Sequence, residues 1–154
     1  DGGLASSCNS LGEMSETGEG ARRDPIAAAI MYRRGCIYAS GEACMNLGRL
    51  QYGGSPGAGS AQEAKATFER GCTYRSELAC ATLKVAFGEN KPYIPNVRRS
   101  EQLRRACDTG HAKDCSLIAL VNLAMGMKPM AQNDLQRACT MGDGFACAIQ
   151  KVAK

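Results

Sequence analysis

Four pairs of cysteines recur along this chain, and the two members of each pair are always eight positions apart. The pairs are Cys36 and Cys44, Cys72 and Cys80, Cys107 and Cys115, and Cys139 and Cys147. Their first members follow one another at steps of 36, 35 and 32 residues. A period of this length is typical of repeat proteins, in which one supersecondary unit stacks on the next. The pattern therefore predicts a series of short, similar units.

Each unit has the residue pattern of two helices joined by a tight turn. A large apolar residue stands four positions before the first cysteine, and glycine or alanine stands directly before it, so both share one helical face. The large residues are Tyr32, Phe68, Leu103 and Leu135. Turn-forming residues such as Ser40-Gly41 precede the second cysteine. We therefore expect an all-α fold, an α/α superhelical solenoid of TPR-like hairpins.

The repeat boundaries follow from the same alignment. We expect one domain over residues 1–154, with a partial repeat at 1–22 and full repeats at about 23–58, 59–94, 95–127 and 128–154. Cys8 aligns with the second cysteine of a unit, and its partner would fall before Asp1. Cys8 is therefore predicted to be free, bonded to another chain, or paired with a cysteine outside this sequence. The chain could then self-associate through Cys8 or through exposed solenoid ends.

The paired cysteines could bind zinc, act as catalytic thiols or form disulfides. Zinc sites usually combine cysteines two to four apart, and this chain has no such spacing and one histidine, His111. A catalytic thiol needs a nearby base. His111 lies between Cys107 and Cys115, but the other units have no comparable residue. On one continuous helix, residues eight apart are separated by about 12 Å, beyond disulfide reach. A turn between them folds the second helix back, so the pattern favours one disulfide in each hairpin and no metal or other cofactor.

The composition supports this reading, because large apolar residues are scarce. Leu, Ile, Val and Phe together number 24 of 154 residues, a small supply for a hydrophobic core. Local disulfides would compensate for the missing core, and they need an oxidising compartment. We therefore expect a secreted or periplasmic protein. No stretch approaches the 18 apolar residues of a membrane span, and the net charge of +4 with no Trp gives little support for nucleic-acid binding.

The cysteine-bearing motifs resemble those of a known family. Arg34-Gly35-Cys36, followed by Ala43-Cys44 and Leu47-Gly48 with the exit loop Tyr52-Gly53-Gly54, resembles Sel1-like repeats. The cysteine-rich branch, which includes the Helicobacter cysteine-rich proteins, is the most similar. The resemblance covers about Cys8 to Gln150 and implies an α/α superhelix, one disulfide in each hairpin and secretion. The third exit loop departs from the pattern, because it is short: MGMKPM.

A binding or scaffold module is the first functional hypothesis, since solenoids offer an extended concave surface to peptides or proteins. An arginine stands two positions before the first cysteine of every unit, and other residues stand five positions before it. The expected ligand surface consists of Met31, Arg34, Thr67, Arg70, Gln102, Arg105, Asp134 and Arg137. The arginines could grip the carboxylates of an acidic peptide. They could instead pack their stems over the hairpin or pair locally with acidic residues.

An enzyme is the second hypothesis, and it comes from the resemblance. Proteins of that branch are linked to penicillin binding and weak β-lactam hydrolysis. The sequence offers no S-x-x-K or K-T-G motif, which a serine enzyme of that type uses, and we name no catalytic residue. Glu13, Glu16 and Glu19 form an acidic cluster that we interpret as solvated.

Overall fold

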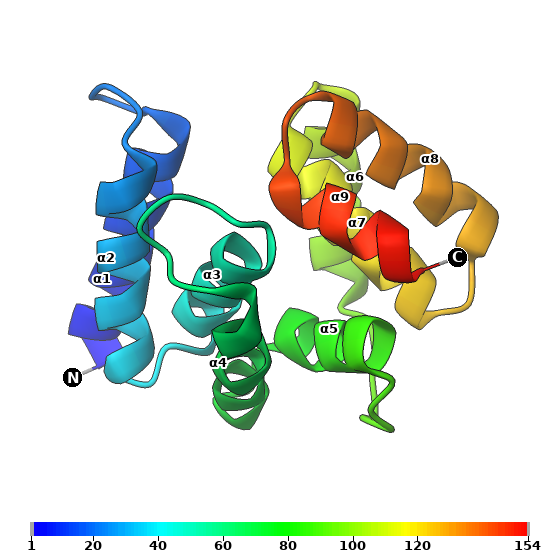
Figure 1. Ribbon diagram of the computed structural model, residues 1–154, viewed down its shortest axis with the longest axis horizontal. Coiled ribbons are helices and arrows are strands. Elements are labelled where there is room, and N and C mark those ends of the chain that lie inside the picture. The colour runs from blue at the N-terminus through cyan, green and yellow to red at the C-terminus, as the bar shows by residue number, and fades with distance from the viewer. Residues whose placement is uncertain (1, 154) are drawn as a thin grey trace. The chain divides into compact units, whose positions relative to one another are not determined.

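The computed structural model describes residues 2–153, and within that range the chain forms nine α-helices and no strand (Figure 1). The helices are α1 (Gly2–Thr17), α2 (Pro25–Ile37), α3 (Gly41–Tyr52), α4 (Ala61–Thr73), α5 (Glu77–Phe87), α6 (Val97–Asp108), α7 (Ala112–Ala124), α8 (Lys128–Thr140) and α9 (Gly144–Val152). Consecutive helices are joined as hairpins, as in the pairs α2 and α3, α6 and α7, and α8 and α9. The all-α repeat fold expected from the cysteine period is confirmed.

The turn inside each hairpin has the same backbone conformation in every repeat. The residue three positions after the first cysteine has a positive φ, which reverses the chain direction at the end of the first helix. The four residues are Ala39, Arg75, Gly110 and Gly142, with φ of 64°, 67°, 94° and 92°. The next residue directly precedes the second helix, and in three turns its side chain caps that helix. Ser40 Oγ accepts from the Ala43 amide, Ser76 Oγ from the Ala79 amide, and Asp143 Oδ1 from the Ala146 amide.

Disulfides connect the two helices of a hairpin directly across these turns. Cys36 is bonded to Cys44, Cys107 to Cys115, and Cys139 to Cys147, with Cα atoms 4.5, 4.5 and 4.8 Å apart. Cys72 and Cys80 are also disulfide-bonded, so the described part of the chain contains four disulfides. The expectation of one disulfide in each hairpin is therefore confirmed, and the pairing rests on the turn that separates each pair of cysteines.

The chain divides into two compact units, one up to Ala79 and the other from Cys80 onward. The division falls inside α5, and α5 departs from the repeat pattern four residues after its cysteine. Lys84 stands there, as Lys151 does in the last unit, whereas the same position in the other three units carries Gly12, Gly48 or Ala119. At Gly12 and Gly48 the missing side chain leaves room for an aromatic ring of the next helix, and a lysine there would overlap that ring. The single continuous domain expected from the sequence stays a prediction.

In the core of the first unit, two aromatic side chains pack closely against glycines of a neighbouring helix. A Cβ atom added to Gly12 would lie 2.5 Å from Tyr32 Cδ1, and one added to Gly48 would lie 2.7 Å from Phe68 Cε1. Both aromatic residues are fully buried. They belong to α2 and α4, and each packs on the helix that precedes its own along the chain. In the first unit, the large apolar residue four positions before the first cysteine therefore supplies the contact between successive repeats.

The exit loop of the first hairpin also contributes to this core. It runs from Gly53 to Ser60 and places the fully buried Ala58 in a cluster with apolar residues of the hairpin. The cluster contains Ala28, Ala29, Tyr32, Leu47, Leu50 and Ala58. Arg33 Nη2 donates hydrogen bonds to the carbonyls of Gly57 and Ala58, at 3.4 and 2.8 Å. The loop is thus folded back over the open end of its own hairpin.

Helix α1 occupies the place of the second helix of a hairpin, as the alignment of Cys8 predicts. Cys8 forms no disulfide, and 7% of it is exposed. It lies against α2, where a Cβ atom added to Gly35 would be 3.4 Å from Cys8 Cβ. Leu4, Leu11 and Met14 of α1 are exposed. Among the residues that the structure describes, no helix has the length and apolar character needed to cross a membrane.

Removing one disulfide tests how far the fold depends on these bonds. Replacing Cys36 and Cys44 together by serine should lower the free energy of unfolding by roughly 2–3 kcal/mol, because the bond closes a short loop in the unfolded chain. Urea unfolding followed by circular dichroism measures the change. The matched control is Cys8→Ala, which removes a cysteine but no disulfide, and it should change stability by less than about 1 kcal/mol. Equal effects of the two changes would contradict this account.

Adding one methyl group tests the contact between repeats. Gly48→Ala should destabilise the protein by roughly 1–3 kcal/mol, because the new methyl would overlap the Phe68 ring. Gly3→Ala is the matched control, since a Cβ there meets nothing within 4 Å and alanine favours the helix. Thermal melting compares the two variants. If Gly48→Ala melts like the wild type, the close approach of the two helices is not needed for stability.

Candidate functional site

A groove lies between α6 and α7 at the open end of the third hairpin, in the second unit. Its volume is about 530 Å³. The apolar part of its lining is Pro95, Val97, Ile118, Val121, Met125 and Met127, and the polar part is Ser100, Glu101, Arg104, Arg105 and Asn122. Val97 and Met125 are 69% and 48% exposed, so the rim presents apolar side chains to solvent. A hollow with apolar walls and a few polar groups is the usual form of a binding site.

Asn122 supplies the most unusual polar group of the groove. The residue is 5% exposed, and its side-chain Nδ2 has no hydrogen-bond partner within the described part of the chain. A buried amide nitrogen without a partner costs about 1–3 kcal/mol. Native proteins rarely tolerate that cost without a reason, and a ligand acceptor that enters the groove would remove it.

Two arginines border the groove, and they differ in their partners. Arg104 donates from Nη1 and Nη2 to the two carboxylate oxygens of Asp134 on α8, both at 2.8 Å. These hydrogen bonds to Asp134 are the main cause that raises the pKa of Arg104. Arg105 is exposed on the rim. The groove therefore has one cation held by α8 and a second cation at its edge.

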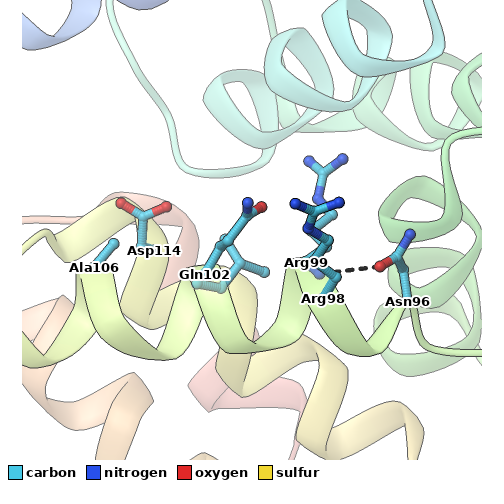
Figure 2. A pocket seen from close by; sticks show the side chains of 7 residues that line it. Asn96, Arg98, Arg99, Gln102, Ala106 and Asp114 are labelled. Atoms are coloured by element: carbon cyan, nitrogen blue, oxygen red, sulfur yellow. Dashed lines mark hydrogen bonds between the residues drawn. The ribbon is translucent and has the colours of Figure 1, made fainter.

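A second hollow of about 500 Å³ lies on another face of α6 (Figure 2). It is lined by Asn96, Arg98, Arg99, Gln102, Leu103, Ala106 and Asp114. Figure 2 shows the side chains of Arg98, Arg99 and Gln102 projecting from the same side of the helix. The Asn96 side chain accepts a hydrogen bond from the Arg99 backbone amide at 3.0 Å and so caps α6. Positive charge and amide groups thus gather near the start of this helix.

The repeated arginines expected to form a ligand surface have two kinds of surroundings. Arg70 Nη2 donates to the Cys36 carbonyl at 3.4 Å, and Arg137 Nη2 donates to the Cys107 carbonyl at 3.2 Å. Each of these two arginines therefore caps the end of the first helix in the preceding repeat. Arg34 and Arg105 are exposed. These bonds go to backbone carbonyls of the preceding repeat rather than to acidic residues, and a ligand-binding role for the four arginines stays a prediction.

The neighbouring positions of the expected surface are divided by burial. Thr67 and Asp134 are 7% and 2% exposed, so little of either side chain is open to a partner, and their part in a binding surface stays a prediction. The Thr67 hydroxyl donates to the Glu63 carbonyl at 3.2 Å, and Asp134 is held by Arg104. Helical periodicity could not separate the buried face from the exposed one at these positions. Met31 is half-buried and Gln102 is exposed.

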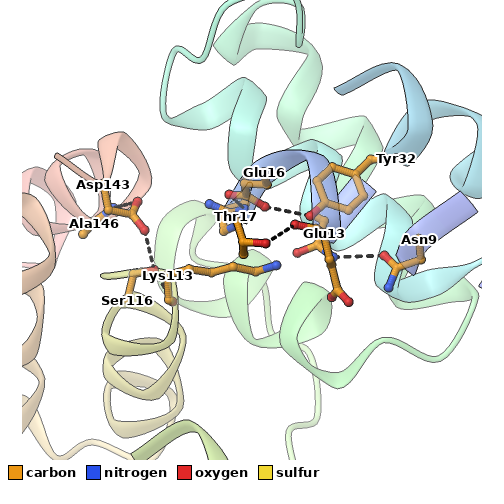
Figure 3. Close-up of polar contacts among 11 residues, drawn as sticks. Asn9, Glu13, Glu16, Thr17, Tyr32, Lys113, Ser116, Asp143 and Ala146 are labelled. Carbon is orange, nitrogen blue, oxygen red and sulfur yellow. Dashed lines mark hydrogen bonds and ion pairs between the residues drawn. The ribbon is translucent and has the colours of Figure 1, made fainter. Parts of the chain in front are cut away.

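A buried polar network joins the first three helices (Figure 3). Glu16 of α1 accepts a hydrogen bond from the Tyr32 hydroxyl at 2.7 Å, and its other carboxylate oxygen is paired with Arg49 of α3. Asn46 Nδ2 donates to Asn9 Oδ1 at 3.0 Å beside it. The prediction that Glu16 is solvated is therefore wrong, because the side chain is 11% exposed and carries two polar contacts. Its partners come from helices whose packing the sequence pattern did not specify.

The contacts of this network hold α1, α2 and α3 together. Burial, and then the negative charge and hydrogen bond of Glu16, raise the pKa of Tyr32 above the usual range.

Within residues 2–153, no group of three or more His, Cys, Asp or Glu side chains is placed to hold a metal ion. His111 is exposed at the start of α7, and its Nδ1 lies 3.0 Å from both the Thr109 hydroxyl and the Ala106 carbonyl. It therefore stabilises a turn.

Sequence reasoning did not identify Asn122, Arg104 or Arg33. A signal was present, because Gln51 and Asn122 stand at the same repeat position, seven residues after the second cysteine. Both are buried amides with an unpartnered polar atom. The short third exit loop can be identified in the sequence, but the hollow that it leaves cannot. Whether a short loop leaves a hollow depends on the packing of the helices around it.

Alkaline titration tests the buried network. The pKa of Tyr32 is raised on folding, so its contribution to stability is fully present below about pH 10 and is lost as the pH rises toward the folded-state value. The free energy of unfolding of the wild type should therefore fall more steeply above about pH 10 than that of Tyr32→Phe. Urea unfolding at a series of pH values gives both slopes. Parallel slopes for the two proteins would show that Tyr32 does not couple folding to its proton.

Comparison with known proteins supports the fold but does not identify a function. No protein-family model and no curated protein sequence matches the chain. A solved structure, the Sel1 repeat protein from Oxalobacter formigenes, matches with a TM-score of 0.50 and 20% sequence identity. The match covers 94% of this chain and 61% of that structure, so the chain spans less than two thirds of its length. With its helical hairpins and four disulfides, the chain has the Sel1-like repeat fold in a cysteine-rich form.

Proposed function

We propose that the chain is a polypeptide-binding module that works in an oxidising compartment, outside the cell or in a periplasm. The groove between α6 and α7 carries this proposal. It combines exposed apolar side chains, the exposed cation of Arg105 and the unpartnered amide of Asn122. Apolar walls provide contact area for side chains of a partner, and directional polar groups select its backbone or its acidic residues.

The compartment follows from the chemistry of the disulfides. Four bonds between cysteines eight residues apart persist where thiols are not kept reduced. The fold supports a binding role in general terms, because helical repeats form extended surfaces whose residues vary without disturbing the core. The concave surface expected from the sequence, with the exposed Arg34 and Arg105, remains part of this proposal.

We expect the partner to carry acidic residues in the part of its chain that contacts Arg105. The protein carries a net charge of +4, and Arg98 and Arg99 add two cations at the start of the same helix. These charges would steer an acidic polypeptide toward α6 and hold its carboxylates by charge-assisted hydrogen bonds.

Charge reversal tests the proposal. Arg105→Glu should reduce capture of partner proteins from the oxidising fraction in which the protein occurs by about tenfold or more, because it replaces attraction by repulsion at the rim. The matched control is Arg22→Glu, which changes the same charge at an exposed residue of the loop between α1 and α2. Capture by immobilised oxidised protein, with quantitative mass spectrometry, measures the difference. Equal losses in both variants, or none in either, would argue against a partner that binds at this groove.

A further inference from the structure

The groove of the third hairpin is the place that the exit loop occupies in the first hairpin. Counting from the cysteines, Val97 corresponds to Ile26, Arg104 to Arg33, Ile118 to Leu47, Val121 to Leu50 and Asn122 to Gln51. Each of these first-hairpin residues contacts the exit loop, lies near it or shares its apolar cluster. The two hairpins therefore carry similar residues at corresponding positions of their open ends, and a covering segment is present on the first.

The contacts of the first hairpin show how a peptide segment fits this surface. A Cβ atom added to Gly57 would lie 3.1 Å from Ile26, and one added to Gly59 would lie 3.4 Å from the Gln51 side-chain nitrogen. Arg33 donates to two consecutive carbonyls of the loop. The Ala58 side chain is fully buried against Leu47 and Leu50. The loop therefore contributes one small apolar side chain and a row of backbone acceptors.

The third hairpin lacks such a segment because its exit is too short. Helix α7 ends at Ala124 and α8 begins at Lys128, so three residues connect them. Eight residues, Gly53 to Ser60, connect α3 to α4. Three residues cannot leave the end of α7, fold back over the hairpin and return to start α8. The apolar walls and the amide that would face a loop are therefore left uncovered.

We propose that the groove binds a short, extended peptide segment of a partner protein, which takes the place of the missing exit loop. An apolar side chain of the segment enters between Val97, Ile118 and Val121, and one of its carbonyls accepts a hydrogen bond from Asn122 Nδ2. Arg104 lies where Arg33 binds loop carbonyls, and Asp134 holds its guanidinium in place. This inference rests on the proposed function and specifies the ligand: a loop-like segment of small and apolar residues, recognised through its backbone.

The chain's own loop supplies the probe. An acetylated and amidated peptide with the sequence of residues 53–60, GGSPGAGS, is titrated into the isotopically labelled, oxidised protein and followed by NMR. Chemical shifts should change at the Asn122 side-chain amide and at Val97, Val121 and Met125. The same peptide carrying Ala58→Leu should bind more tightly, because the groove of about 530 Å³ leaves room for a larger apolar side chain.

Three variants decide the outcome. Asn122→Ala should weaken binding about fivefold, the loss expected for one neutral hydrogen bond, whereas Gln51→Ala at the equivalent covered position should leave it unchanged. Replacing residues 125–127 by residues 53–60 should cover the groove and abolish peptide binding. Shift changes confined to other surfaces, no shift changes at all, or equal effects of Asn122→Ala and Gln51→Ala would overturn the inference. Partner capture that still depends on Arg105 in that case would leave the proposed function standing.

Discussion

The disulfide at each bend is the constraint on which the rest of this structure depends. The chain has few large apolar residues, and much of its core consists of alanine, glycine and cysteine in close contact. Small side chains allow helices to approach closely, but they bury little apolar area. Bonds such as Cys36–Cys44 offset this shortage because they restrict the unfolded chain locally. The left-handed residue at each turn, for example Gly110, places the two sulfurs within bonding reach.

Once the hairpins are held at their bends, their open ends are free to differ. The first hairpin covers its open end with a long loop that buries Ala58 and satisfies Arg33. The third hairpin has a three-residue exit and leaves a groove at the corresponding place. The bend therefore provides a constant framework, and the length of the exit loop decides whether a repeat closes on itself or presents a surface. Binding sites of repeat proteins commonly arise from such variation on a fixed framework.

The repeated arginines illustrate where sequence reasoning reaches its limit. A residue that recurs at the same offset in every unit can serve the repeat or a ligand, and the sequence does not distinguish the two. Arg70 and Arg137 hold carbonyls at the end of a preceding helix, whereas Arg105 is exposed beside a groove. The same applies to acidic residues, since Glu16 is paired with Arg49, which is distant in sequence. Pairing of this kind depends on which helices become neighbours.

The sequence by itself determined the helical hairpins, their period and the disulfide in each hairpin. These features depend on short-range spacing: eight residues between cysteines, a turn between them, and apolar residues at helical offsets. The tertiary structure decided the burial of Thr67 and Asp134, the Tyr32 network and the groove around Asn122. These features arise from the packing of helices against one another and from the path of a loop across them. Offsets along one helix contain no information about either.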